Sequence, residues 1–410
     1  MILFDNYWNA SLNEMLKQYQ QQKGVQITWE MPPLSGFYQR QMSLSLAKEK
    51  KPDIIAGNDT ILSQYAGSGL IEPLDDYLKE ANLAGADYNW TEFPEQTRKA
   101  ASWSKDSSSP AKVYGLPFEL ATWAYFYRSD LIEKPPETFT DYIEIAKQFT
   151  KSINPKSPTE YGAAIQGKQL PPQYKEWYAW LWAYGGEIFD DKLQPVINSS
   201  AAVKSLEDDY GLLLNLKATP PDTASYDNAA ATAAFQNGLF PQMILWTNQY
   251  PIYVDAEKSP KIAGKVKYAM VPGMPGPDGK VKRFPYAQQW MLGLNPNGEH
   301  KEEAFKVIAW LTSPKGQLAW AKAGYAGVVR PSVLKDPEMQ KKNPDFVVRL
   351  EATAIGRYGP TFVPEYAQIA DSELLPALSQ VLAGTKSAKS ALDQVNEKAT
   401  TIMKSAGHIK

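Results

Sequence analysis

Residues 174–186 are the feature that most constrains this chain, because they hold three of its twelve tryptophans, three tyrosines and a closing pair of glycines. At 100° per residue, a helix here carries two aromatic stripes. A helix needs only one stripe to join a core, so the second either belongs to the core of a large domain or meets another lobe, a partner or a ligand. The two stripes consist of Trp177, Trp180, Leu181 and Tyr184, and of Tyr174, Tyr178 and Trp182.

The length of 410 residues predicts two domains or one large barrel. Charged residues make up 21% and hydrophobic residues 43%, which is typical of a soluble globular protein. The formal net charge of −2 shows no excess of positive charge that would attract nucleic acid or an anionic membrane. We therefore expect neither as a partner.

The residue inventory restricts the chemistry available to the chain. Cysteine is absent, which removes disulfides, thiolate nucleophiles and cysteine-based metal sites. His300 and His408 are the only histidines, which argues against an imidazole-based metal site or a catalytic triad. The sequence also lacks dinucleotide-binding, phosphate-loop and zinc-protease motifs. We therefore expect no metal, no cofactor and no catalytic residues.

The first third of the chain predicts a layered α/β domain, with a strand at 2–4, a helix at 9–22 and a strand at 25–29. A further buried strand is expected at 52–56. Ligands of open α/β sheets bind at the carboxyl ends of the strands, so polar and aromatic side chains at these ends are candidate ligand contacts. These candidates are Asp5, Asn6, Trp8, Asn58 and Asp59.

Later segments continue the alternation of strands and helices. We expect a strand at 123–127, a helix at 141–150 capped by Thr140, and a strand at 161–165. Strands are also expected at 241–248 and 288–294, followed by helices at 301–311 and 313–323, the last opened by Ser313 and Pro314. The strand ends supply three further candidate ligand contacts, Trp246, Asn248 and Trp290.

Two stretches in the first third, 51–55 and 65–75, resemble the bacterial extracellular solute-binding proteins of carbohydrate-uptake ABC transporters, the maltose-binding-protein-like family. The runs 113–119 and 125–132 look like that family's first crossover between lobes, and 268–280 resembles the second. The resemblance covers nearly the whole chain. It implies an α/β, two-lobed type II periplasmic-binding-protein fold, with a hinge and an interlobe ligand cleft. It implies discontinuous lobes, with residues 1–120 and 272–313 in lobe one and 121–271 and 314–410 in lobe two.

The same resemblance suggests roles for individual residues. It places Glu119 at the hinge beside the cleft and places Tyr325 and Arg330 in a loop that returns to the cleft. It places the aromatic helix against the sugar, and we assign Trp177 and Trp180 to the ligand and Tyr178 with Trp182 to the core. Helical phase separates these two pairs but does not determine which one faces the ligand.

The function implied is that of the extracytoplasmic substrate-binding component of an ABC importer. Such a monomer would capture a carbohydrate, whether a monosaccharide, an oligosaccharide or a polyol, by hinge closure and deliver it to a membrane permease. The start at Met1 is typical of a mature form whose export signal is absent, so we expect a periplasmic protein or a cell-surface lipoprotein. The alternatives are a polysaccharide-active enzyme, either a glycoside hydrolase or a lyase, and a scaffold whose aromatic helix binds protein.

Overall fold

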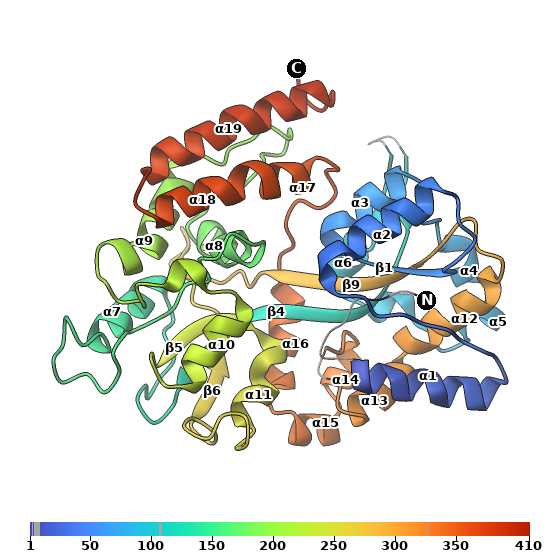
Figure 1. The fold of residues 1–410 in the computed structure, drawn as a ribbon, viewed down its shortest axis with the longest axis horizontal. Coiled ribbons are helices and arrows are strands. Elements are labelled where there is room, and N and C mark those ends of the chain that lie inside the picture. The colour runs from blue at the N-terminus through green and yellow to red at the C-terminus, as the bar shows by residue number, and fades with distance from the viewer. Residues whose placement is uncertain (2, 4–8, 106–108, 326) are drawn as a thin grey trace. The chain divides into compact units, whose positions relative to one another are not determined.

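The computed structural model describes residues 1, 3, 9–105, 109–325 and 327–410 and divides the chain into two compact units (Figure 1). Neither unit is continuous in sequence. Unit 1 comprises Met1–Ala121, Ala287–Ala354 and Thr361–Pro364. Unit 2 comprises Thr122–Tyr286, Ile355–Pro360 and Glu365–Lys410.

This division differs from the expected lobes mainly in two long segments. Residues 272–286 belong to unit 2 rather than to the first lobe, and residues 314–354 belong to unit 1 rather than to the second lobe, as do the short pieces at residue 121 and residues 361–364. The physical reason for the second difference lies in long-range contacts that no local pattern encodes. Trp320, for example, donates from Nε1 to Ser11 Oγ at 2.8 Å and stacks on Phe118.

Unit 1 combines a small sheet with many short helices. Its strands are β1 (Ile54–Asn58), β2 (Ser102–Trp103), β3 (Lys112–Val113), the first part of β4 (Leu116–Arg128) and β9 (Ala287–Leu294). Its helices are α1 (Asn9–Lys23), α2 (Leu34–Leu46), α3 (Asp59–Gly67), α4 (Asp75–Lys79), α5 (Ala81–Ala84), α6 (Glu95–Ala100), α12 (Lys301–Thr312), α13 (Pro314–Lys322), α14 (Pro331–Leu334), α15 (Pro337–Lys342), α16 (Phe346–Ile355) and the 3₁₀ turn Trp90–Glu92.

The sheet of unit 1 is organised around β9, which has β1 on one side and β4 on the other. β1 and β9 run antiparallel, with Ile54 opposite Leu294 and Asn58 opposite Trp290. Every residue of β1 is buried. Because the strands are antiparallel, the carboxyl end of β1 meets the amino end of β9, and both ends contribute to the candidate site described below.

Unit 2 is built mainly from longer helices. Its strands are the second part of β4, β5 (Gln242–Trp246), β6 (Val266–Ala269), β7 (Met274–Pro275) and β8 (Val281–Lys282). Its helices are α7 (Phe139–Gln148), α8 (Pro172–Ala183), α9 (Ser200–Leu214), α10 (Asn228–Gln236), α11 (Tyr250–Val254), α17 (Tyr366–Gln368), the π-helix Ile369–Leu374, α18 (Leu375–Leu382), α19 (Ala388–Ser405), and the 3₁₀ turns Thr223–Ser225 and Thr247–Gln249.

In unit 2, β4 pairs antiparallel with both β5 and β6, which places Trp123 opposite Trp246. The aromatic helix predicted at 174–184 is α8, and all its residues after Pro172 are buried. It packs against α9 and α18, and α18 runs beside α19 (red in Figure 1). The sequence left open whether both aromatic stripes of this helix are core, and in the structure both are buried.

Most of the helices predicted from periodicity are confirmed, including α1, α12 and α13, the last capped by Ser313 as expected. Two predicted strands are wrong. Residues 25–29 and 161–165 form no strand. In the second stretch, Gly162 and Ala163 both donate to the Ala218 carbonyl oxygen in a loop, and in the first the Ile27 amide donates to the Gln20 side chain of α1. The predicted strand at 2–4 lies largely outside the described residues.

The predicted cap of α7 is also wrong, because Thr138 rather than Thr140 begins the helix. Thr138 and Asp141 form a reciprocal capping box, in which the Thr138 hydroxyl accepts from the Asp141 amide. We expect Thr138→Ala to lower the free energy of unfolding by about 1 kcal/mol, because this acceptor is lost. Urea denaturation measures the change. Thr140→Ala, an exposed control two residues away, is expected to leave the midpoint unchanged.

Within the described residues, no helix combines the length and the apolar character needed to cross a bilayer.

Candidate functional site

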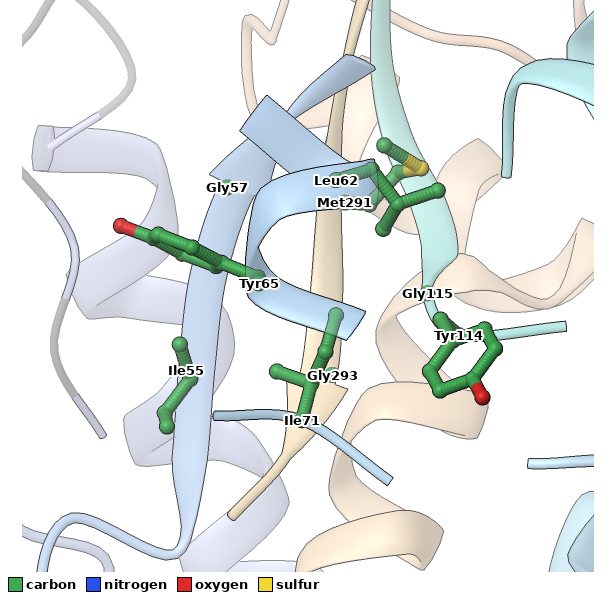
Figure 2. A pocket seen from close by; sticks show the side chains of 9 residues that line it. All are labelled: Ile55, Gly57, Leu62, Tyr65, Ile71, Tyr114, Gly115, Met291 and Gly293. Carbon is green, nitrogen blue, oxygen red and sulfur yellow. The ribbon is translucent and has the colours of Figure 1, made fainter. Parts of the chain in front are cut away.

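The small cavity in Figure 2 lies within the core of unit 1, between α3 and the strands β1 and β9. Its lining is mainly apolar, and the hydroxyls of Tyr65 and Tyr114 point away from it. The volume of about 10 Å³ is enough for roughly one water molecule. A sugar or polyol cannot enter this cavity, so the candidate ligand contacts lie elsewhere in each unit.

Unit 1 contributes a group that we call the strand-end group: Tyr38, Asn58, Asp59 and Trp290. Asn58 ends β1 and caps α3, its Oδ1 accepting from the Thr60 amide at 3.1 Å while its Nδ2 donates to the Tyr38 hydroxyl at 3.1 Å. The Tyr38 and Trp290 rings stack with centroids 6.2 Å apart. The Asp59 carboxylate accepts from the Gln289 amide at 2.9 Å.

Three residues that the sequence predicted at two distant strand ends, Asn58, Asp59 and Trp290, are therefore brought together in unit 1. Antiparallel pairing of β1 with β9 causes this. The group offers carboxylate and amide functions beside a planar indole face. Those are the functions that hold hydroxyls and C–H surfaces in small-molecule sites.

Unit 2 contributes a set that we call the aromatic cluster: Trp123, Tyr178, Trp182, Trp246 and Tyr286. The Tyr286 ring is at its centre, stacked on Trp182 at 6.0 Å with an interplanar angle of 3° and edge-on to Trp246 at 6.0 Å. Trp123 lies 4.8 Å from Trp246, because the two occupy paired positions of β4 and β5. Trp246 is 8% exposed, the most of the five.

Charged side chains border the aromatic cluster. The Arg357 guanidinium lies 4.6 Å above the Trp182 ring and donates to both carboxylate oxygens of Glu187, at 3.0 and 2.9 Å. Lys175 is buried, with its ammonium group 5.7 Å from the centre of the Tyr286 ring. Burial raises the pKa of Asp371, which the charge of Lys175 opposes.

Sequence reasoning missed Arg357, Glu187 and Tyr286. Tyr286 directly precedes β9, so the start of that strand was the available signal. Arg357 reaches the cluster through a bridge between residues 286 and 357, a contact between segments far apart in sequence. No local pattern indicates it.

The assignment of Trp177 and Trp180 to the ligand is not supported by their packing. The Trp177 indole donates to Ser205 Oγ of α9 at 3.0 Å, and the Trp180 ring stacks on Phe139 of α7 with centroids 3.9 Å apart. Both rings are at most 1% exposed and lie in the core of unit 2. The other pair of the helix, Tyr178 and Trp182, is 0% and 3% exposed and belongs to the aromatic cluster, although the sequence assigned it to the core.

Arg330 and Tyr325 are also buried within unit 1. The Arg330 guanidinium lies 3.8 Å from the centre of the Phe93 ring, donates to the Thr312 and Asn89 carbonyl oxygens at 2.8 and 2.6 Å, and pairs with Glu92. Burial lowers its pKa from the ordinary value. Tyr325 stacks on Trp320 and donates to the Phe118 carbonyl oxygen. These contacts fix a loop and do not support a ligand role for either residue.

The remaining candidates are less informative. Glu119 is buried in β4 within unit 1, and Asn248, in unit 2, accepts from the Gln249 side chain at 3.1 Å. Asp5, Asn6 and Trp8 lie outside the described residues. Among the residues that the structure describes, no cluster of three histidine or carboxylate side chains could hold a metal ion.

The fold and these surfaces can now be compared with known proteins. The family model described as "Bacterial extracellular solute-binding protein" matches residues 6–318. The chain belongs to this family. Its members are substrate-binding proteins and not enzymes, so the alternative of a polysaccharide-active enzyme is dropped.

Relatives of this solute-binding protein include an erythritol/L-threitol-binding protein of Mycolicibacterium smegmatis, 24% identical over 80% of the chain and 69% of the relative. A maltotriose-binding protein of Pyrococcus abyssi is 25% identical over 77% of the chain and 62% of the relative. The chain thus spans about two thirds of the length of these relatives. The maltose-bound MalE3 structure of T. maritima superposes with a TM-score of 0.84 at 23% identity, over 98% of each chain, and establishes the two-lobed fold.

Proposed function

We propose that this solute-binding protein captures a carbohydrate, either a sugar or a polyol, outside the cytoplasm and delivers it to the membrane permease of an ABC importer. In this proposal the solute stacks on the aromatic cluster of unit 2. Hinge closure captures it, and the closed form is the one that the permease recognises. We further propose that the protein acts as a monomer in the periplasm or on the cell surface.

The observation that carries the proposal is the aromatic cluster with its charged border. Carbohydrates present flat C–H faces that stack on indole and phenol rings, and hydroxyls that take paired hydrogen bonds. Arg357 and Glu187 already neutralise one another, which favours a neutral ligand over one carrying a carboxylate. Relatives named for a tetritol and a trisaccharide support the class while leaving the size open.

A thermal-shift screen tests the proposal. The panel contains erythritol, threitol, maltose and maltotriose, with glutamate and leucine as non-carbohydrate controls. A true ligand at 100 times its dissociation constant should add about 2.7 kcal/mol to the free energy of unfolding. Calorimetric titration then gives the affinity, and micromolar binding corresponds to about −8 kcal/mol. No thermal shift with any of the carbohydrates, or a thermal shift with the amino acids alone, would contradict the proposed ligand class.

A further inference from the structure

The contact between α8 and α9 in unit 2 contains two buried carboxyl groups, Glu176 and Asp209, which are 3% and 1% exposed. Glu176 Oε2 accepts from the Gln166 amide at 2.9 Å. Within the described part of the chain, neither oxygen of Asp209 has a hydrogen-bond donor. Asp209 lies one turn after Ser205, the residue that accepts from Trp177 and so joins the two helices.

Among the described groups whose charge acts on this pair, none is positive. Those whose ionisation is coupled to the pair are acidic: Tyr142 of α7, Tyr184 at the end of α8, and Asp208 and Tyr210 of α9. The neutral side chains are Gln166, beside Glu176, and Gln173, beside Tyr210. Lys204 is exposed and pairs with the Asp208 carboxylate, so its charge does not compensate the buried pair.

An ionised carboxylate without a donor or a cation, as Asp209 would be, is strongly unfavourable in a protein interior, and the charge of a second buried carboxylate makes it worse. Such groups retain a proton instead. Burial raises the pKa of Glu176 to about 8. Burial also raises the pKa of Asp209 well above its ordinary value, and the charge of Glu176 raises it further.

We propose that Glu176 and Asp209 keep a proton between them in the folded protein and that this proton positions α8 on α9. The pair would then make the stability of unit 2 fall as the pH rises from about 4.5 towards 8. Since α8 also carries Tyr178 and Trp182, the same proton would position two of the five members of the aromatic cluster. The importance of this positioning for the aromatic cluster rests on the proposed function, whereas the protonation of Glu176 and Asp209 does not.

The direction of the pH dependence follows from linkage. The ordinary pKa of a glutamate is 4.5, and the folded value of Glu176 is raised to about 8. The protonated pair is therefore fully stabilising below about pH 4.5, and its contribution is lost as the pH rises towards 8. Over this interval folding takes up about one proton at Glu176.

Urea denaturation between about pH 5 and pH 9 tests the proposal. The wild-type midpoint should fall across this range more steeply than that of Glu176→Gln or Asp209→Asn. The difference in slope should correspond to about one proton at pH 7. Glu207→Gln is the matched control, because it removes the same charge from the exposed face of α9 and should keep the wild-type slope.

A wild-type slope in both Glu176→Gln and Asp209→Asn would overturn the proposal. If neither variant folds, infrared spectroscopy of the wild type decides, because a protonated carboxyl band must be present at pH 7 and disappear above about pH 9. The absence of this band at pH 7 would also overturn the proposal. No sugar enters either experiment, so its outcome is independent of the ligand screen.

Discussion

Trp246→Ala is expected to abolish carbohydrate binding while leaving the unliganded protein folded. Trp246 ends β5 at the most exposed position of the aromatic cluster, where it contacts both Trp123 and Tyr286. Aromatic residues in such positions carry a large share of binding energy, and truncation costs about 2–4 kcal/mol, or roughly 30- to 1,000-fold in affinity. Calorimetric titration with the carbohydrate identified by the screen measures the loss.

Trp177→Phe is the control for this experiment. Trp177 is buried in the core of unit 2 and bonded to Ser205, so its replacement should lower the melting temperature and leave the affinity close to that of the wild type. Wild-type affinity in Trp246→Ala together with lost affinity in Trp177→Phe would contradict a ligand site at the aromatic cluster. It would support the assignment of Trp177 to the ligand, which was made from the sequence.

Arg330→Met is expected to destabilise unit 1 by about 3–5 kcal/mol, because it removes a buried guanidinium and leaves its partners unsatisfied. The losses are the bonds to the Thr312 and Asn89 carbonyl oxygens, the ion pair with Glu92, and the stacking on Tyr88 and Phe93. Urea denaturation of the unliganded protein measures the change in the free energy of unfolding.

Arg40→Met provides the comparison within the same unit. Arg40 pairs with Glu30 at 2.8 Å, but both side chains are about half exposed, so its loss should cost at most about 1 kcal/mol. Below its melting temperature, Arg330→Met should still bind the carbohydrate with unchanged affinity. An unaltered stability combined with lost binding would show that Arg330 is a ligand contact, as the sequence suggested, and not a structural residue.

Local sequence patterns were sufficient for much of the fold. The periodicity of residues 9–22 and 301–311 identified α1 and α12, and Ser313 with Pro314 identified the start of α13. These features depend on residues a few positions apart, which a linear reading captures. The two predicted strands at 25–29 and 161–165 failed because of partners that local sequence does not show: Ile27 bonds to a side chain of α1, and residues 162 and 163 bond to a loop.

The candidate site was only partly accessible from the sequence. Strand ends indicated Asn58, Asp59 and Trp246, which the structure places beside other aromatic or polar groups, and their role as ligand contacts stays a prediction. Arg357 and Glu187 were not found, because they meet Trp182 only through contacts between segments far apart along the chain.

The sequence by itself determined the family, through motifs spread along the chain, and it determined that an aromatic helix would be central to the second unit. Only the tertiary structure decided which stripe of that helix enters the aromatic cluster. Both stripes are equally apolar, so helical phase separates them without orienting them. The packing of Phe139 on Trp180 and of Tyr286 on Trp182 provides the orientation, and both partners come from outside the helix.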